Sequence, residues 1–333
     1  MDQRLPDVAR ATVRTLGRVC LCVAIACACA HPLVAQTRDE PAGELPAYSV
    51  SFDNDAFAAW VTEHATDFEY TAGTHVRIRG PRAWQTEFEI GQELYTPRRN
   101  APTVRPGDRP YAGLLYGAVR THFAALHLQH TVTVLGGVIG PPAGGAEVQD
   151  AVHRLLGNPL RVGWPHQIET EPALGVAWSA ERAVRTSQLL PGVPLRAELS
   201  PQVGLESGTL RSAARGALRA AVTWGSVMAE QSSPSDALRR AAGAGARGPS
   251  GVYVSVWARY EMAWVTQNEL LTSRVYGSVQ PGTVPLPHVT MATVGIALRW
   301  GRYGVEYSLS RLGREYRTEP TSFRYGTLSF VRW

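Results

Sequence analysis

Hydrophobic and polar residues alternate along much of this chain. In residues 252–261 valine, alanine and tyrosine take every second position, and the positions between them carry Tyr253, Ser255, Trp257, Arg259 and Glu261. A strand with one apolar and one polar face has this period of two. The alternating stretches run for roughly 9 to 14 residues, which suits a tilted strand crossing a bilayer, whereas strands of soluble sandwiches are nearer five or six. The pattern therefore favours a membrane barrel.

A second stretch, residues 126–135, shows the same period. Leu126, Leu128, Val132 and Val134 share one face, and His127, Gln129, Thr131 and Thr133 take the other. About twelve such stretches occur, an even number, as bacterial barrels require. They cover residues 46–54, 70–79, 84–95, 111–122, 126–137, 168–182, 193–206, 212–226, 249–263, 287–300, 302–311 and 321–333. The last stretch ends on Trp333, and a terminal aromatic residue is typical of outer-membrane barrels. The sequence predicts an all-β, twelve-stranded antiparallel outer-membrane β-barrel.

Five longer segments separate the predicted strands, namely 56–69, 96–110, 139–167, 227–248 and 264–286. In outer-membrane barrels the extracellular loops are long and the periplasmic turns are short. We therefore expect most of these segments to be extracellular.

The first 35 residues resemble a cleaved secretory signal. Four arginines (Arg4, Arg10, Arg14 and Arg18) precede the apolar residues 19–30, and "HPLVA" offers a cleavage site near Ala35. All four cysteines lie inside this segment, so the exported protein has no thiol or disulfide. We expect residues 1–35 to be the signal peptide and residues 36–333 to be a single membrane-spanning domain in the outer membrane.

The charge of the chain argues against a nucleic-acid partner. The formal net charge is +5, and all 33 basic residues are arginine. The signal carries four arginines and two aspartates, which leaves about +3 for the rest of the chain. No basic cluster with interleaved aromatic residues occurs. Arginine can still bind phosphate through two parallel hydrogen bonds, so a phosphorylated ligand stays open.

Polar residues interrupt the alternation at two strand ends. Asp53, Asn54 and Asp55 follow one another at the end of the first predicted strand. A solvated strand exit explains such a run equally well, but carboxylate and amide oxygens also suit Ca²⁺ or can orient a catalytic histidine. Thr71 stands near the start of the second strand, where its hydroxyl could face the lumen and donate to a substrate carbonyl.

One loop at a predicted barrel end is rich in arginine. Arg98, Arg99, Arg105 and Arg109 lie between the third and fourth strands. Loop arginines are mostly solvated, but beside an outer leaflet they would meet the phosphates of lipopolysaccharide.

The segment "GVIGPPAGGAEVQDAVHRLLG", residues 137–157, changes from strand to helix. Its prolines end the preceding strand, and Glu147 stands near the positive end of the expected helix. Gln149 and His153 are four residues apart, so they share one side of that helix. A single histidine on a helix is more often a packed or surface residue than a catalytic base.

Several motifs in fixed order resemble the outer-membrane lipid A 3′-O-deacylase family. They are "NDAF", "YTAG", "GQELYTP", "DRPYAGLLYG" and the 137–157 segment with its following "GW" and "QIE". The likeness is sharpest from Ser51 to Glu171. It implies a twelve-stranded barrel with an active site inside the barrel near the outer leaflet, and hydrolysis of the 3′-linked acyl group of lipid A in lipopolysaccharide.

The resemblance also implies roles for individual residues. His153 would be the general base that activates water, and Asp55, with Asn54, would support catalysis through Ca²⁺. Thr71 and Gln149 match further residues of the family's site. We expect the helix to fold into the barrel mouth with His153 opposite Asn54 and Asp55, in a protein that acts as a monomer.

Two positions depart from the family pattern. The family has a glutamate six residues after the histidine that steadies the ring, and Pro159 stands there. Asp150, Glu169 or Glu171 could replace it. The family's lysine–arginine pair is absent because the chain has no lysine, so Arg98, Arg99 or Arg105 would have to contact the substrate.

Other chemistries have less support. The sequence has no Gly-x-Ser-x-Gly elbow, no phosphate loop and no histidine spacing typical of zinc sites. Two alternatives stay open: a non-catalytic outer-membrane barrel, porin-like or structural, and a soluble secreted β-protein.

Overall fold

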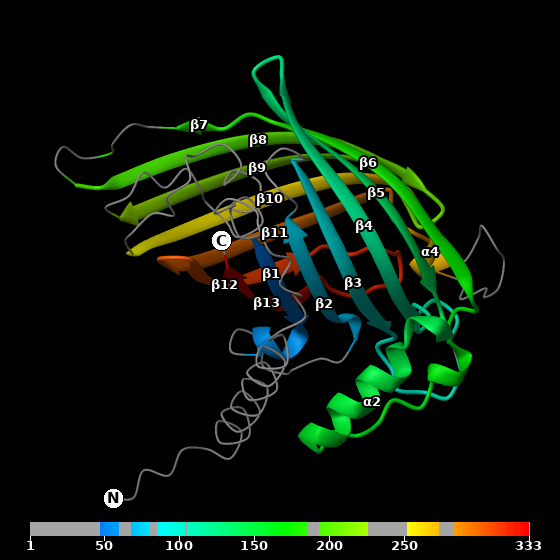
Figure 1. Ribbon diagram of the computed structural model, residues 1–333. Helices are drawn as coiled ribbons and strands as arrows, with labels where there is room; N and C mark the ends of the chain where they lie inside the picture. Colours follow the sequence, from blue (N-terminus) through cyan, green and yellow to red (C-terminus); the bar gives the residue numbers. More distant parts are fainter. Residues whose placement is uncertain are drawn as a thin grey trace, which may run out of the picture.

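Twelve antiparallel strands form one closed ring in the computed structural model (Figure 1). The structure describes residues 47–59, 68–79, 85–103, 105–185, 189, 193–225, 252–272 and 283–332. The ring strands are β1 (Tyr48–Asn54), β2 (Glu69–Arg79), β3 (Thr86–Thr96), β4 (Ala112–Ala125), β5 (Leu128–Ile139), β6 (Glu171–Glu181), β8 (Leu195–Gly208), β9 (Arg211–Gly225), β10 (Val252–Asn268), β11 (His288–Trp300), β12 (Tyr303–Leu312) and β13 (Phe323–Arg332). The predicted fold class is confirmed.

Two pairings close the ring. β1 pairs with β13 along its whole length, from Tyr48 opposite Arg332 to Asn54 opposite Gly326. β6 pairs with β8, and the two-residue strand β7 (Val184–Arg185) extends the ladder on β8 beyond the reach of β6. Closure removes the sheet edges, so main-chain hydrogen bonds are satisfied without water, as hydrocarbon demands.

The strand positions agree with the alternation of the sequence, with two differences. Leu126 and His127, expected in a strand, have φ values of +51° and +60° and form the turn between β4 and β5. The expectation that they alternate with Leu128 and Gln129 is therefore wrong. β10 is longer than expected and continues to Asn268. The following segment, expected to begin at residue 264, therefore begins at residue 269. That segment opens with the short helix α4 (Glu269–Thr272).

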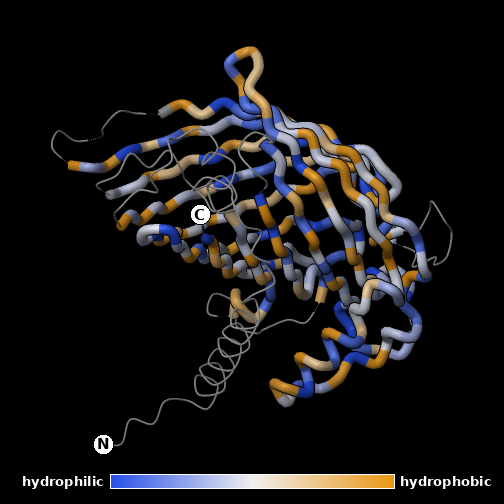
Figure 2. The backbone as a smooth tube through the Cα atoms, viewed as in Figure 1, coloured by the Kyte–Doolittle hydropathy of each residue, from blue (hydrophilic) through white to orange (hydrophobic). Residues whose placement is uncertain are grey.

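The barrel wall is apolar outside and polar inside, the reverse of a soluble protein. Hydrophobic and hydrophilic residues alternate along its strands (Figure 2). Outward side chains such as Ile90, Val134 and Val256 are exposed, at 66%, 55% and 56%. Ionisable side chains of the ring strands are buried in the lumen. Among them are Glu87, Glu89, His122, Arg219, Glu261, Arg299 and Glu306. Exposed apolar area of this extent needs lipid against it, so the ring is a membrane-spanning barrel.

Aromatic residues mark both edges of the apolar belt. Trp224, Trp300 and Tyr303 are exposed at one end of β9, β11 and β12, and Trp264 stands near the other end of β10. Trp and Tyr prefer the boundary between hydrocarbon and head groups. The belt between these residues is the part of the wall that faces acyl chains.

The two ends of the barrel differ in their connections. At one end of the barrel the strands are joined by the loops 55–68, 97–111, 140–170, 269–287 and 313–322. At the other end β1 begins, β13 ends, and short turns such as 126–127 and 301–302 join the strands. Long loops identify the extracellular end. β9 ends and β10 begins at the opposite, periplasmic end. The predicted loop 227–248 between them lies outside the described residues.

Helical pieces gather at the extracellular end. They are η1 (Asp55–Ala58), η3 (Pro141–Ala143), α2 (Gly145–Leu156), η4 (Trp164–His166) and α4. No helix among the described residues is long and apolar enough to cross a membrane. The expected signal segment, residues 1–35, lies outside the described residues.

Val256→Arg tests the lipid-facing surface. The arginine would enter hydrocarbon between the aromatic residues at the two edges of the belt. The cost of such a residue is about 2–4 kcal/mol at the bilayer midplane and falls to about 0–1 kcal/mol toward the interfaces, so a loss between these limits is expected. Reversible unfolding in lipid vesicles measures this loss. The control is Gln202→Glu, which puts a charge into the polar lumen, because Gln202 Oε1 accepts from Arg259 at 2.8 Å and a carboxylate can keep that contact. Equal losses for the two variants would contradict the assignment of the faces.

Candidate functional site

Helix α2 packs on the outer side of the barrel wall. On β3 the lumen-facing positions are Glu87 and Glu89, so Gln92 and Leu94 point outward. Gln92 Nε2 donates to the carbonyl of Ala143, directly before α2, at 2.7 Å. α2 itself packs against β3 and β4. The helix is therefore attached to the exterior of the rim.

Glycines shape the local fold around α2. Gly144 at its beginning and Gly157 at its end have φ values of +69° and +74°, which glycine adopts without strain. Gly145 lies so close to Trp164 that a Cβ atom there would be 2.8 Å from the indole ring. Trp164 packs with Leu94 and Tyr111, and this apolar cluster joins the helix to the wall.

His153 has one ring nitrogen fixed by the main chain. Its Nδ1 lies 2.6 Å from the carbonyl oxygen of Pro159, and the side chain is 3% exposed. A carbonyl oxygen only accepts, so Nδ1 carries the proton of this bond. The neutral ring then has its lone pair on Nε2. The Pro159 carbonyl thus takes the place at Nδ1 that Asp150, Glu169 or Glu171 was expected to fill. Asp150 instead pairs with Arg154 at 3.3 Å.

Gln149 lies on the same buried side of α2. Trp164 Nε1 donates to Gln149 Oε1 at 2.7 Å, and an indole N–H only donates, so the orientation of the amide is fixed. Gln149 Nε2 is buried and has no hydrogen-bond partner among the residues that the structure describes. A buried amide donor without a partner costs about 1–3 kcal/mol. Such a donor next to a histidine is available to a ligand.

The short helix η1 covers the outer wall on the other side of β1. Asn54 caps it, because its Oδ1 accepts from Ala56 N at 2.8 Å. Phe57 lies over Gly326 of β13, and the outward-facing Tyr307 donates to the carbonyl of Phe57 at 2.7 Å. Asp55, the first residue of η1, is 5% exposed. β1 and β2 therefore lie between β13, on which η1 packs, and β3 and β4, which carry α2.

Thr71 lies at an irregularity of β2. The register with β3 shifts between Tyr70 and Ala72, and the Thr71 hydroxyl bonds that of Thr96 at 2.7 Å. Alternation from Leu94 places Thr96 on the outer side of the wall. The expectation that Thr71 faces the lumen is therefore wrong.

The structure brings the expected residues to one rim but not into the lumen. Gln149 and His153 share the wall-facing side of α2, while Asn54 and Thr71 lie on the outer faces of β1 and β2. The expectation of a helix inside the barrel mouth is wrong, because Gln92 and Leu94, which hold the α2 segment, point outward. An exterior location places the candidate site beside the outer leaflet.

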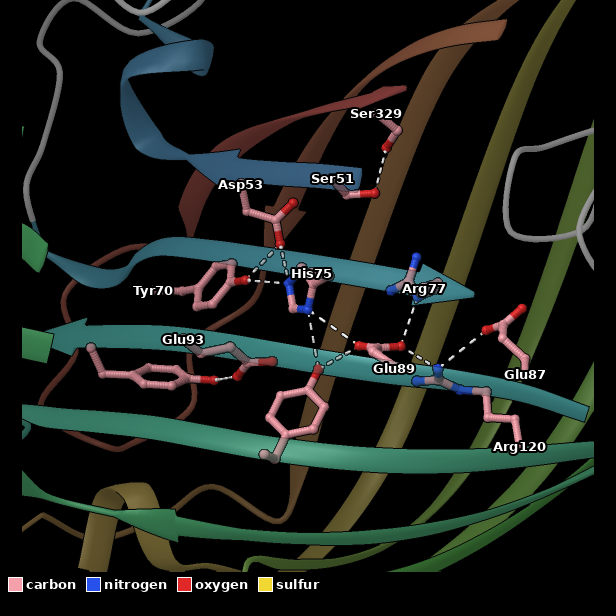
Figure 3. A network of polar contacts seen from close by, with 12 residues as sticks. Ser51, Asp53, Tyr70, His75, Arg77, Glu87, Glu89, Glu93, Arg120 and Ser329 are labelled. Atoms are coloured by element: carbon pink, nitrogen blue, oxygen red, sulfur yellow. Dashed lines mark hydrogen bonds and ion pairs between the residues drawn. The ribbon is translucent and has the colours of Figure 1, made fainter. Parts of the chain in front are cut away.

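Asp53, the neighbour of Asn54, points into the lumen (Figure 3). Its Oδ2 accepts from Tyr70 at 2.6 Å and lies 3.2 Å from His75 Nε2. His75 Nδ1 in turn lies 3.3 Å from Glu89 Oε1. Asp53 therefore belongs to an interior network and does not join Asp55 in an acidic pair.

The interior network continues along β3 and β4. Glu89 also pairs with Arg77 at 2.7 Å and with Arg120, and Arg120 lies 3.3 Å from Glu87 (Figure 3). These charges are paired, as burial requires. They tie β2, β3 and β4 together from inside, behind the stretch of wall that carries α2.

The loop arginines have different environments. Arg99 and Arg105 are exposed, and Arg98 stacks on Phe68 with 4.5 Å between its Cζ and the ring centre. Arg109 is fully buried and pairs with Glu69 at 3.1 Å and Glu315 at 3.4 Å. The expectation that Arg109 meets lipopolysaccharide phosphates with the others is therefore wrong.

Arg109 holds two loops together. Burial would lower the pKa of Arg109, but Glu315 and Glu69 outweigh this effect and the pKa is raised. Tyr316 donates to Glu69 at 2.8 Å from the 313–322 loop. Removing one partner of such a buried pair costs about 3–5 kcal/mol. The cluster therefore fixes loops 97–111 and 313–322 at the extracellular end.

A family model described as outer membrane protein LpxR matches residues 19–332. The chain belongs to the LpxR family of outer-membrane proteins. The resemblance found in the motifs is confirmed at the level of the family. A comparison with curated proteins gives no match.

Solved structures agree with the LpxR fold. LpxR from Salmonella typhimurium has 21% identity and a TM-score of 0.70, with 86% of this chain and 99% of that chain covered. The β domain of the Bordetella autotransporter BrkA has 10% identity and a TM-score of 0.44, covering 87% of this chain and 100% of that chain. The likeness to the Salmonella protein supports the barrel architecture.

Sequence reasoning missed several residues of the rim. Trp164 orients Gln149, Thr96 holds Thr71, and Gln92 anchors the α2 segment. The sequence does indicate the side on which Gln92 and Thr96 lie. They occupy even-numbered positions of β3 and face outward, whereas Glu87 and Glu89 occupy odd-numbered positions and face the lumen. Nothing in the sequence indicates the contact between the Pro159 carbonyl and His153, because a main-chain contact depends on the path of the loop and not on the residue type.

Proposed function

We propose that this protein is an outer-membrane lipid A 3′-O-deacylase. It would hydrolyse the ester of the 3′-linked acyl (acyloxyacyl) group of lipid A, the membrane anchor of lipopolysaccharide. Membership of the LpxR family supports the proposal, and so does the exterior rim position of α2, where an outer-leaflet lipid can approach from the side. The observation that carries it is the His153–Pro159 hydrogen bond.

That bond prepares His153 as a base. With Nδ1–H donated to the Pro159 carbonyl, Nε2 is the nitrogen able to accept a proton from water. The activated water attacks the ester carbon, and the tetrahedral intermediate collapses with release of the 3′ oxygen. The proton then passes from the imidazolium to that oxygen. A positioned general base accelerates such a reaction by about 10²–10⁴-fold.

Gln149 is our candidate for the oxyanion donor. Its oriented amide Nε2 lies on the side of α2 that carries His153 and lacks a partner among the described residues. A preorganised donor is worth most where charge develops in a site shielded from water. Asn54 would act by capping η1 and holding Asp55, and Thr71, fixed by Thr96, would position the substrate.

Calcium enters the proposal only through Asp55. Ca²⁺ takes about six to eight oxygen ligands. In the described part of the chain no group of three or more His, Cys, Asp or Glu side chains is placed to hold a metal. These side chains alone do not complete a site, and no step above depends on the ion. Ca²⁺ on Asp55 would supply positive charge for the oxyanion, with its other oxygens from main chain, water or lipid.

The head group of lipid A would meet the exposed loop arginines. Arg99 and Arg105 are accessible, and Arg98 is held by Phe68 at the same end of the barrel. Arginine binds phosphate through two parallel hydrogen bonds, so these residues can replace the lysine of the family pattern.

His153→Ala should reduce release of the 3′-linked acyl group by at least about 100-fold, because the base is lost. The measurement is mass spectrometry of lipid A from cells producing wild type or variant, with heat-dependent gel mobility showing that both barrels insert. Unchanged release would end the assignment. Unaltered lipid A with the wild type, together with conductance in planar bilayers, would favour a non-catalytic barrel.

Gln149→Glu separates the oxyanion donor from the structural hydrogen bond. Glutamate keeps an oxygen for Trp164 but replaces the NH₂ group by a second oxygen. We expect kcat to fall by about 10²–10³-fold with a smaller change in KM. Trp164→Phe is the matched control, because the amide stays while its orienting bond is lost, and it should have a milder effect. Equal activity of wild type and Gln149→Glu would exclude the donor role.

Asp55→Asn tests the calcium ligand. If Asp55 holds Ca²⁺, chelation and the substitution remove the same contribution, so their effects on deacylation should not add. Activity of both proteins is measured with and without a chelator, and with Ca²⁺ restored. A chelator that lowers the activity of Asp55→Asn by the same factor as that of wild type would place any calcium elsewhere.

A further inference from the structure

α2 carries an exposed apolar stripe that the proposed chemistry does not use. Val148, Ala151, Val152 and Leu155 follow the i, i+3, i+4, i+7 spacing of one helix side. All four are exposed, the two valines and the leucine at 39%, 41% and 56%. A stripe of this kind on a water-facing helix would be costly.

The helix has three distinct sides. Gly145, Gln149 and His153 face the barrel wall and are buried. Asp150 and Arg154 form an ion pair on another side, where the Arg154 side chain is 67% exposed. At about 100° per residue, the apolar stripe lies between these sides, next to the buried one. α2 is therefore suited to contact protein, water and a third, apolar environment at once.

The apolar stripe continues a surface that already faces lipid. α2 is attached outside β3 and β4, and outward-facing Leu115 near the start of β4 is 37% exposed. Leu174 near the start of β6 is 53% exposed. Leu160 and Val162, which follow the helix, are exposed as well. The lipid-facing belt of the barrel thus reaches the rim on which α2 sits.

We propose that α2 is a membrane-interface helix whose Val148–Leu155 stripe lies among the acyl chains of the outer leaflet. The arginine-bearing side would then face head groups and water, as in amphipathic helices that lie in the interface. This depth would place His153, on the adjacent side of the helix, near the boundary where acyl chains join their ester groups. The proposal rests on the exterior position of α2 and does not require that the protein be a deacylase.

Spin labels on two sides of α2 test the proposal. Residues 47–333 contain no cysteine, so Val152→Cys and Arg154→Cys each provide a single labelling site in the mature chain. Each labelled barrel is inserted into phosphatidylcholine–phosphatidylglycerol vesicles. Electron paramagnetic resonance then measures collisions of the label with oxygen, which dissolves in hydrocarbon, and with a water-soluble nickel chelate. Val256→Cys calibrates a label in hydrocarbon, since Val256 belongs to the belt.

The expected result is an oxygen-to-nickel ratio for the residue 152 label several-fold above that of the residue 154 label and close to that of the residue 256 label. Equal ratios at 152 and 154, whether watery or lipid-like, would overturn the sided placement of the helix. Heat-dependent gel mobility confirms that each variant is folded. The readout is independent of catalysis, so an active His153→Ala enzyme would refute the proposed function and leave this result unaffected.

Discussion

Closure of the main-chain hydrogen-bond ring is the constraint on which the rest of this structure depends. In hydrocarbon an unpaired N–H or C=O costs several kcal/mol, so every strand must pair on both sides. Once the register is fixed, the pleat decides the side of the wall for each residue. Asp53 and Asn54 are neighbours in sequence, yet Asp53 joins His75 in the lumen while Asn54 caps η1 outside.

The two sides of the wall have separate tasks at the extracellular rim. Inside, Glu89 pairs with Arg77 and Arg120 and holds three strands together. Outside, the same strands carry Gln92, Leu94 and the attached α2. Because the interior is braced by paired charges, the outer face is a rigid base for a helix. A lipid substrate in the outer leaflet has access to that face without entering the lumen.

The alternation in the sequence was enough to predict the ring, and the ordered motifs were enough to predict the family. Residues 252–261 show why, since each residue there lies on the side that its period of two assigns. The side of α2 was predicted wrongly, because a helix after a strand end can fold either way and its direction depends on glycine contacts such as Gly145 against Trp164. Arg109 was misplaced for a similar reason: its partners Glu69 and Glu315 lie far along the chain.

Pro159 departs from the family pattern but still orients the imidazole ring of His153. What changes is the strength with which this position stabilises the positive charge of the ring. A carboxylate at this position would both orient the imidazole and stabilise its positive charge, whereas the Pro159 carbonyl orients the ring through a neutral acceptor. Hydrogen bonds to charged groups contribute about 1.5–3 kcal/mol, against about 0.5–1.5 kcal/mol for neutral ones. In the proposed reaction the Pro159 carbonyl therefore stabilises the imidazolium less than a carboxylate at this position would. Stabilisation of the oxyanion, for which Gln149 is the candidate donor, then carries more of the rate enhancement.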